Sequence, residues 1–186
     1  REVIDAFNMP TFEVPGFEAD DVIGTLAKQA KAQGVPVTIV TLDTDLLQLV
    51  EDGVDVYLYR PYVKGQAAVT YDVAGVNERY GFGPELIPDF KGLKGDASDN
   101  IPGVPGIGDK TATKLIQEFG SVENIFKRIK DVKPDKLREK LIENEHAARF
   151  STEMATITRE APRELDLASC KLTGFDRANV EELFHS

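Results

Sequence analysis

The chain has 186 residues, enough for one ordinary domain or two small ones with a real core. Acids outnumber bases by 32 to 22, and the net charge of −10 argues against a basic sleeve for nucleic acid, although an acidic pocket for cations remains open. One cysteine and two histidines exclude a disulfide framework and a cysteine-cluster zinc site, and they leave little room for histidine-based chemistry. No apolar run is long enough to cross a membrane and no signal peptide is recognisable, so we expect no membrane partner and a cytoplasmic location.

Both ends of the chain resemble interrupted helices. Val3, Ile4 and Phe7 read as the end of a helix already under way, and residues 178–186 read as a helix that stops early. We therefore expect a fragment of a longer protein, with a processed chain as the alternative.

The first part of the chain alternates helices with strands. Residues 18–33 carry apolar side chains at helical spacing, with acids in the first turn and a glycine after the last, which predicts a helix. The β-branched run 37–42 predicts a strand that is covered on both faces, as in a parallel sheet. A short helix is expected at 44–50, a half-buried strand at 54–59 and a helix at 72–80. This order is typical of a doubly wound α/β unit.

Beyond Gly81 the strand signals fade, and short helices joined by glycine- and proline-containing loops follow. These helices are expected at residues 84–90, 109–119, 122–129, 134–143, 146–158 and 177–184. The sequence therefore predicts two domains, an α/β domain over residues 1–81 and an all-α region over residues 82–186.

The first of three acidic clusters opens the helix predicted at 18–33. Glu18 and Asp21 lie three residues apart on one helix face and can converge, whereas Asp20 points about 100° away from Asp21 and fits less well. Acids also favour helix N-termini through capping and the helix dipole, so a purely structural role is the alternative.

The other two clusters lie after the predicted strand and in a later loop. Asp43 and Asp45 directly follow the strand, where open α/β sheets bind ligands, and they can reach one cation or serve as a turn or helix cap. A haloacid-type phosphatase motif is disfavoured, because Leu47 stands where that motif requires threonine or valine. Asp96 and Asp99 lie in a polar loop that Asx turns alone could explain.

Together the clusters provide seven carboxylates, and clustered anions repel one another unless cations neutralise them. Hard oxygen ligands suit Mg²⁺ or Mn²⁺, and two such ions a few ångström apart form the usual clamp for phosphodiester hydrolysis. Without these seven acids the chain has 25 acids against 22 bases, so its net charge no longer argues against a DNA partner.

A glycine-rich segment, residues 103–111, leads into the helix predicted at 109–119. It does not fit the P-loop template, because an aspartate stands where that template requires lysine. Its glycines can still present backbone N–H groups at a helix N-terminus, a natural phosphate cradle, and Lys110 and Lys114 can add charge there. A tight turn that serves helix packing alone is the alternative.

Two further sets of side chains allow only weaker interpretations. Lys91 and Lys94 lie three residues apart near the third acidic cluster, where they either help to hold phosphate or belong to a solvated face. Phe119, Phe126 and Phe150 are expected to pack in the core rather than to stack on bases.

Four segments, in this order and across nearly the whole chain, resemble the 5′ nuclease domain of bacterial DNA polymerase I, a family related to the flap endonucleases. The segments are residues 16–21, 41–46, 95–103 and 106–112. The resemblance implies a PIN-like α/β domain with a parallel sheet, here incomplete, followed by an all-α region with a helix-hairpin-helix-type DNA-binding element.

The resemblance also implies a function: a metal-dependent 5′–3′ exonuclease or flap endonuclease that acts on DNA in replication and repair, linked covalently to a polymerase domain. It implies two Mg²⁺ or Mn²⁺ ions on Glu18, Asp20, Asp21, Asp43, Asp45, Asp96 and Asp99, of which Asp43, Asp45, Asp96 and Asp99 are expected to be catalytic. The family's DNA-gripping loop, which often holds K⁺ through its carbonyls, corresponds to Gly103, Gly106, Ile107, Gly108, Lys110, Thr111 and Lys114.

The family also has front strands that supply two further aspartates and a basic helical arch, and neither lies in these 186 residues. The prediction therefore concerns the parent protein more directly than this chain alone. Two other hypotheses remain: a duplex-DNA-binding module without chemistry that uses only the glycine loop, and a PIN-like ribonuclease that shares the acids.

Overall fold

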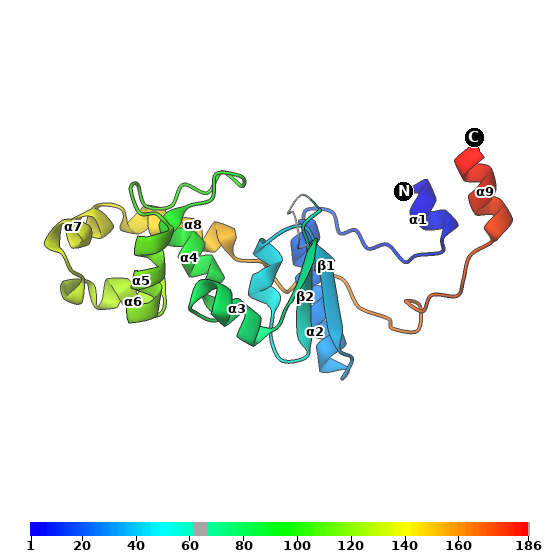
Figure 1. Ribbon diagram of the computed structural model, residues 1–186, viewed down its shortest axis with the longest axis horizontal. Coiled ribbons are helices and arrows are strands. Elements are labelled where there is room, and N and C mark those ends of the chain that lie inside the picture. The colour runs from blue at the N-terminus through cyan, green and yellow to red at the C-terminus, as the bar shows by residue number, and fades with distance from the viewer. Residues whose placement is uncertain (62–66, 186) are drawn as a thin grey trace. The chain divides into compact units, whose positions relative to one another are not determined.

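The structure is a computed structural model that describes residues 1–61 and 67–185 (Figure 1). Contacts divide the chain into two compact units. The terminal unit consists of Arg1–Val35 and Thr158–Ser186, and the central unit consists of Pro36–Ile157. These units do not coincide with residues 1–81 and 82–186, and that division into domains stays a prediction. In the parts of the chain described, no helix has both the length and the apolar character needed to cross a membrane.

The terminal unit joins both ends of the chain. Its helices are α1 (Glu2–Ala6), α2 (Ala19–Ala32) and α9 (Arg177–His185). Helices α1 and α9 contact each other, and next to them the rings of Phe7 and Phe175 lie 4.6 Å apart between centroids. Sequence elements that are distant along the chain therefore share one small apolar cluster.

Helix α2 confirms the predicted helix and carries buried residues of the terminal unit. Val22, Ala27 and Ala30 fall on its buried face, as the apolar spacing predicted. Thr25 is buried as well, and its hydroxyl accepts a hydrogen bond of 2.9 Å from the backbone N–H of Ala161. This bond satisfies a polar group that would be costly to bury alone, and it fixes the returning chain against α2.

The central unit contains a three-stranded sheet in the order β1-β2-β3. Strands β1 (Val37–Thr41) and β2 (Val54–Tyr59) are parallel, with Val37 opposite Val54. The third strand, β3 (Ala68–Tyr71), is antiparallel to β2. The two predicted strands are confirmed, whereas β3 was not predicted, and it makes the sheet mixed.

Burial along β1 differs from the expectation. Only Ile39 of this strand is buried, and Val40 is 70% exposed. The prediction that β1 is covered on both faces is therefore wrong. A run of β-branched residues shows strand propensity, but the packing around the strand decides which faces are covered.

Most of the remaining helices of the central unit lie near their predicted positions, although the helix predicted at 84–90 continues to residue 94 and the helix predicted at 122–129 ends at residue 127. They are η1 (Asp45–Leu49), α3 (Val73–Tyr80), η2 (Pro84–Leu86), α4 (Ile87–Lys94), α5 (Asp109–Phe119), α6 (Val122–Lys127), η3 (Ile129–Asp131), α7 (Asp135–Glu143) and α8 (Glu145–Ala155). The η elements are short 3₁₀ helices.

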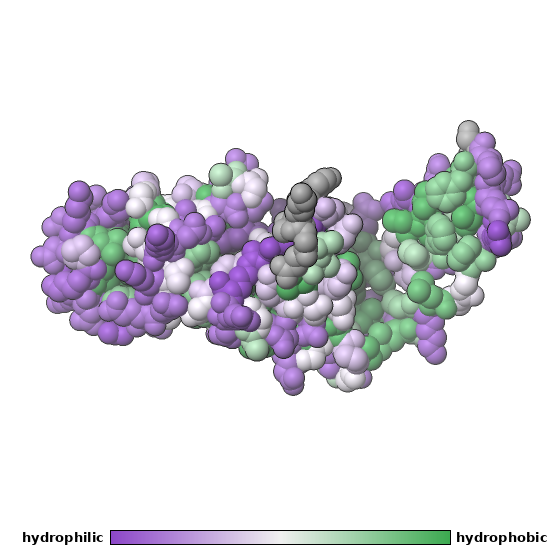
Figure 2. All heavy atoms as spheres, viewed as in Figure 1, coloured by the Kyte–Doolittle hydropathy of each residue, from purple (hydrophilic) through white to green (hydrophobic). Residues whose placement is uncertain are grey.

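Helix α4 lies at the centre of the helical region and packs against α8, α5 and η1. Gly92 permits the close approach of α8, because a Cβ there would lie 1.9 Å from the hydroxyl oxygen of Thr152. Phe119 and Phe126 are buried as predicted, whereas Phe150 is 48% exposed, so its predicted core position is wrong. Hydrophilic residues cover the surface of this region around α5, α6 and α7 (Figure 2).

Candidate metal centre

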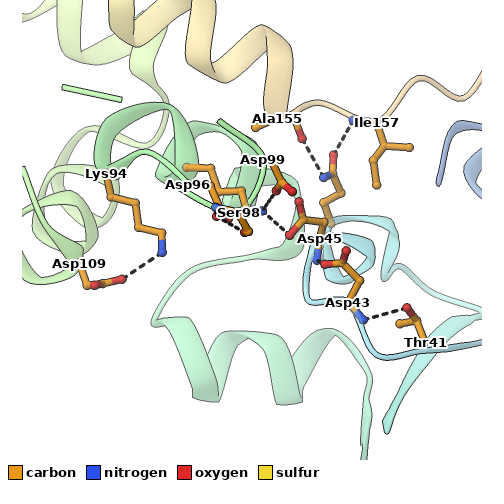
Figure 3. A network of polar contacts seen from close by, with 12 residues as sticks. Thr41, Asp43, Asp45, Lys94, Asp96, Ser98, Asp99, Asp109, Ala155 and Ile157 are labelled. Carbon is orange, nitrogen blue, oxygen red and sulfur yellow. Dashed lines mark hydrogen bonds and ion pairs between the residues drawn. The ribbon is translucent and has the colours of Figure 1, made fainter. Parts of the chain in front are cut away.

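Three carboxylates from two separate segments of the central unit converge on one point. Asp45 opens η1 directly after the β1 strand, and Asp96 and Asp99 lie in the loop that follows α4. One oxygen atom from each residue lies within 4.8 Å of the other two. Figure 3 shows these side chains pointing toward one another, with Asp43 beside them. We call Asp45, Asp96 and Asp99 the acidic trio.

A buried lysine ammonium group lies within the acidic trio. Lys91, from α4, contacts the carboxylate of Asp45, and its Nζ lies 2.7 Å from Asp96 Oδ2 and 3.5 Å from Asp99 Oδ2. The Lys91 side chain is only 5% exposed. The acidic trio therefore already surrounds one positive charge that the protein itself supplies.

Local hydrogen bonds fix the segment that carries Asp45. The backbone N–H of Asp43 donates to the hydroxyl of Thr41 over 2.9 Å, and the N–H of Asp45 donates to Asp43 Oδ1 over 2.9 Å. Farther along η1, the side chain of Gln48 donates to the carbonyl of Ala155 and accepts from the N–H of Ile157. Asp43 thus acts as the turn residue that the sequence offered as an alternative.

The loop that carries the other two acids is closed by backbone pairing. The N–H of Asp96 donates to the carbonyl of Ile101 and the N–H of Ile101 donates back, each over 2.8 Å. Both the N–H and the hydroxyl of Ser98 donate to Asp96 Oδ1. The Asx turn considered as an alternative is therefore present, and it orients Asp96 so that its other oxygen faces Lys91.

The electrostatics of the trio follow from burial and from Lys91. Burial raises the pKa of Asp45 to about 6, although Lys91 opposes this shift. Partial burial would also raise the pKa of Asp96, but the ion pair with Lys91 and the hydrogen bonds from Ser98 outweigh it and lower this pKa to about 2. Burial would lower the pKa of Lys91, but its contacts with Asp45 and Asp96 raise it, so the ammonium stays charged.

The first acidic cluster lies in the terminal unit, at the start of α2. Glu18 and Asp21 form a reciprocal capping box, and Asp21 Oδ1 also accepts a 2.8 Å hydrogen bond from the N–H of Thr158. The capping role considered from the sequence is therefore present. Asp20 is half-buried in the same turn. The assignment of Glu18, Asp20 and Asp21 as metal ligands stays a prediction.

The acidic trio fits a hard divalent cation. All its donors are carboxylate oxygens, the donor type that Mg²⁺ and Mn²⁺ prefer. The ammonium of Lys91 already occupies a cation position among them, which shows that the arrangement of oxygens attracts positive charge. Lys94, Gly95 and Asp96 belong to the wall of an open hollow of about 450 Å³ that adjoins the trio through Asp96. A ligand can therefore approach this edge from solvent.

The predicted DNA-gripping segment forms a turn between α4 and α5. Gly103 and Ile107 are buried, and Thr111 is half-buried. The exposed members of the segment are Gly106, Gly108, Lys110 and Lys114. The turn is joined to the end of α4 because the N–H of Val104 donates to the carbonyl of Leu93 over 2.8 Å.

Helix α5 begins at this turn, with Gly108 as its N-cap in an extended conformation. The first N–H groups of a helix have no acceptor within the helix and carry its positive dipole end. This geometry presents free donors at an exposed surface, as an anion-binding turn requires. The contact of this turn with DNA stays a prediction.

The position of Lys91 was not predicted from the sequence. The solvated-face interpretation considered for it is wrong, because the side chain is buried among carboxylates, whereas phosphate binding by Lys91 stays a prediction. Lys94 is half-buried and pairs with Asp109 over 3.4 Å. The sequence contains one indication of this contact: Asp96 follows Lys91 by five residues, just beyond the end of a helix. That spacing is compatible with an ion pair but does not require one.

Solved structures with a similar fold are those of nucleases. A structure of T5 5′-exonuclease with bound zinc ions aligns with 95% of this chain and 60% of its own, with a TM-score of 0.71 and 22% identity. A structure of the catalytic core of Rad2 with a DNA substrate aligns with 98% of this chain and 59% of its own, with a TM-score of 0.62 and 20% identity. At these identities the likeness establishes the fold.

Sequence comparison then gives the family. Two family models match, the 5′–3′ exonuclease N-terminal resolvase-like domain over residues 1–81 and the 5′–3′ exonuclease C-terminal SAM fold over residues 82–178. The chain belongs to the 5′–3′ exonuclease family. The DNA polymerase I proteins of Chloroflexus aurantiacus and Bacillus caldotenax are 44% and 45% identical to it over 185 residues, or 99% of this chain. The chain spans about a fifth of the length of these curated relatives. The predicted order, an α/β part followed by a helical part, is confirmed.

Proposed function

We propose that the protein is a metal-dependent 5′–3′ exonuclease and flap endonuclease that hydrolyses phosphodiester bonds of DNA, as part of DNA replication and repair. The single observation that carries this proposal is the acidic trio, whose three carboxylates converge on one cation position in a chain of the 5′–3′ exonuclease family. The solved structures of similar fold include one with divalent metal ions and one with a DNA substrate, which supports both partners by analogy.

The proposed ligands are Mg²⁺ or Mn²⁺, two ions in all. Asp45, Asp96 and Asp99 would hold metal directly, and the carboxylate of Asp43 would complete this part of the site. Glu18, Asp20 and Asp21 remain the further candidate ligands. When bound, the ions would supply the Lewis-acid assistance that phosphodiester hydrolysis requires, both for the attacking water and for the leaving oxygen.

The protein's own residues would position the substrate. The exposed N–H groups at the start of α5, with Lys110 and Lys114 on the same helix, would hold phosphates of the DNA backbone without reading sequence. We also propose that carbonyl groups of the turn around Gly103 and Gly106 hold K⁺. The parent protein would carry a covalently linked polymerase domain, as its DNA polymerase I relatives suggest, and a DNA substrate of this kind would place it in the cytoplasm.

The test is cleavage of a 5′-labelled DNA flap by the intact parent protein in millimolar Mg²⁺, with EDTA as the metal-free reference. Asp45→Asn and Asp99→Asn should each lower the cleavage rate by at least about a hundredfold, because each removes one charged ligand while keeping the shape of the side chain. Asp52→Asn is the matched control, since this exposed acid lies outside the acidic trio. Full activity of both trio variants would refute the proposal.

The same assay separates the alternatives. A DNA-binding module without chemistry predicts salt-sensitive duplex binding that EDTA does not change and no cleavage by the protein or by its parent. A PIN-like ribonuclease predicts that an RNA flap of the same sequence is cleaved faster than the DNA flap. Glu18→Gln, Asp20→Asn and Asp21→Asn, assayed in parallel, decide whether the first acidic cluster takes part.

A further inference from the structure

We propose that Lys91 is a positioning residue for the candidate metal centre: an internal cation that holds the acidic trio together and limits the affinity of the trio for divalent ions. This inference rests on the proposed function, because it assumes that the trio binds metal. It goes beyond that function because it assigns a role to a lysine, a residue type that does not ligate these ions.

The first argument is geometric. The Lys91 side chain is 5% exposed and ends among oxygens of all three trio carboxylates, at 2.7 Å from Asp96 and 3.5 Å from Asp99 and in contact with Asp45. A buried ammonium needs several charged or polar acceptors, and the trio is the set that Lys91 contacts. Without a cation at this point, three carboxylates within 4.8 Å of one another would repel strongly.

The second argument concerns how Lys91 is supported. It lies on α4, the helix that packs against both α8 and η1, and its own backbone carbonyl accepts a 2.7 Å hydrogen bond from the N–H of Gly95. The ammonium is therefore placed by a rigid helix rather than by a mobile side chain on the surface. Such support is what keeps an ion pair at a fixed geometry when a ligand arrives.

The third argument is the charge balance. Three ionised carboxylates and one ammonium have a net charge of −2, which a single divalent ion neutralises. A divalent ion and the Lys91 ammonium compete for the same carboxylate oxygens of the acidic trio. Metal binding therefore requires some of the ion pairs of Lys91 to break. Lys91 therefore preorganises the ligands and at the same time weakens their hold on the metal, which favours exchange of the ion over permanent occupancy.

The experiment measures Mn²⁺ binding to the 186-residue protein by the electron paramagnetic resonance signal of the free ion. Lys91→Met keeps the length of the side chain and removes its charge, and we expect its Mn²⁺ affinity to rise by about tenfold or more, because a neighbouring positive charge no longer repels the ion. Its metal-free melting temperature should fall below that of the wild type. Lys91→Arg keeps the charge and should bind Mn²⁺ within about threefold of the wild type.

Lys94→Met is the matched control. Lys94 lies one helical turn from Lys91, is half-buried and pairs with Asp109 instead of with the trio. Its loss should change Mn²⁺ affinity by less than about threefold. An equal gain in Lys94→Met and Lys91→Met would show a general charge effect and would overturn the inference, as would an unchanged or weaker affinity in Lys91→Met.

Two further measurements test the inference if Lys91→Met does not fold, and separate it from the proposed function. If Lys91→Met is unfolded without metal, its circular dichroism is followed during Mn²⁺ addition: refolding supports the proposed role, and failure to refold at concentrations that saturate the wild type refutes it. Asp99→Asn separates this inference from the proposed function. If wild type and Asp99→Asn bind Mn²⁺ equally, the trio is not the metal site and the proposed function itself fails, whatever the Lys91 variants show.

Discussion

Gly103→Ala tests whether the glycine turn and the acidic loop are built as one piece. Gly103 has a φ of +61°, and a Cβ at this position would lie 2.2 Å from the backbone nitrogen of Gly95 and 2.6 Å from its Cα. Neither neighbouring atom is the end of a flexible side chain. The substitution must therefore move the backbone at the beginning of the acidic loop.

The expected cost has three parts. A left-handed conformation costs a non-glycine residue about 1–2 kcal/mol, and forcing an extra carbon into a packed site costs about 1–3 kcal/mol. The smaller conformational freedom of alanine in the unfolded chain offsets about 0.4–1 kcal/mol. We therefore expect the free energy of unfolding of Gly103→Ala to fall by about 2–4 kcal/mol.

Urea unfolding followed by circular dichroism at 222 nm measures this loss, and no tryptophan signal is available in this chain. Gly108→Ala is the matched control: its φ is −106°, and a Cβ there meets no atom within 4 Å. The lower N-cap preference of alanine and its smaller unfolded-state entropy nearly cancel, so this variant should change stability by less than about 0.5 kcal/mol. A loss below about 1 kcal/mol in Gly103→Ala, or equal losses in both variants, would refute the reasoning.

Three further substitutions test the surroundings of the candidate site. Ser151→Ala should cost about 1–3 kcal/mol in urea unfolding, because the fully buried Ser151 hydroxyl accepts the N–H of Gly103 over 3.0 Å and nothing replaces it. Gln48→Leu should cost about 1–2 kcal/mol, because it removes two hydrogen bonds to the chain at the end of α8. Asp89→Asn should flatten the pH dependence of stability: burial raises the folded-state pKa of Asp89, so the wild type loses stability relative to the variant as pH rises from about 4 through that pKa.

The outcomes that would contradict these predictions are equally specific. Ser169→Ala removes an exposed hydroxyl and should cost less than about 0.5 kcal/mol, so an equal loss in Ser151→Ala would mean that burial does not matter. An unchanged unfolding midpoint for Gln48→Leu would show that its two bonds are replaced by water. If the wild type instead gained stability relative to Asp89→Asn as pH rises, the sign would be the reverse of that expected, because the 2.7 Å bond from the N–H of Val122 would then outweigh burial.

The sequence predicted most of the helices because their signals are local. Helix α5 was predicted at its observed bounds, since Ala112, Leu115, Ile116 and Phe119 form one apolar stripe that ends before a glycine. Strand β3 was missed because four residues carry too short a pattern, and its pairing with β2 depends on a partner elsewhere in the chain. The exposure of Val40 and Phe150 was likewise missed, because the sequence shows how apolar a residue is but not what packs against it.

In the candidate site, too, local sequence patterns identify some residues, whereas the place of others depends on tertiary packing. The sequence identified Asp45, Asp96 and Asp99, because carboxylates after a strand and in a polar loop are typical of metal sites. It did not identify Lys91, because a lysine near acids is ordinarily a solvated residue and only tertiary packing buries it. The capping roles of Glu18 and Asp21 were foreseen as an alternative to metal binding, and both carboxylate oxygens of Asp21 accept backbone N–H groups, one from Glu18 and one from Thr158.

The end of α4 links the two proposed activities of the protein. Lys91 reaches the acidic trio, the carbonyl of Leu93 accepts the N–H of Val104 in the glycine turn, and the N–H of Gly95 closes the helix. Residues 91–104 therefore carry both the support of the metal centre and the start of the phosphate cradle. Because backbone hydrogen bonds close this segment on itself at Gly95, Asp96 and Val104, a duplex held at the glycine turn would lie at a fixed distance from the acidic trio. A flexible insertion within residues 91–104 should therefore lower the rate of cleavage while the protein still binds DNA.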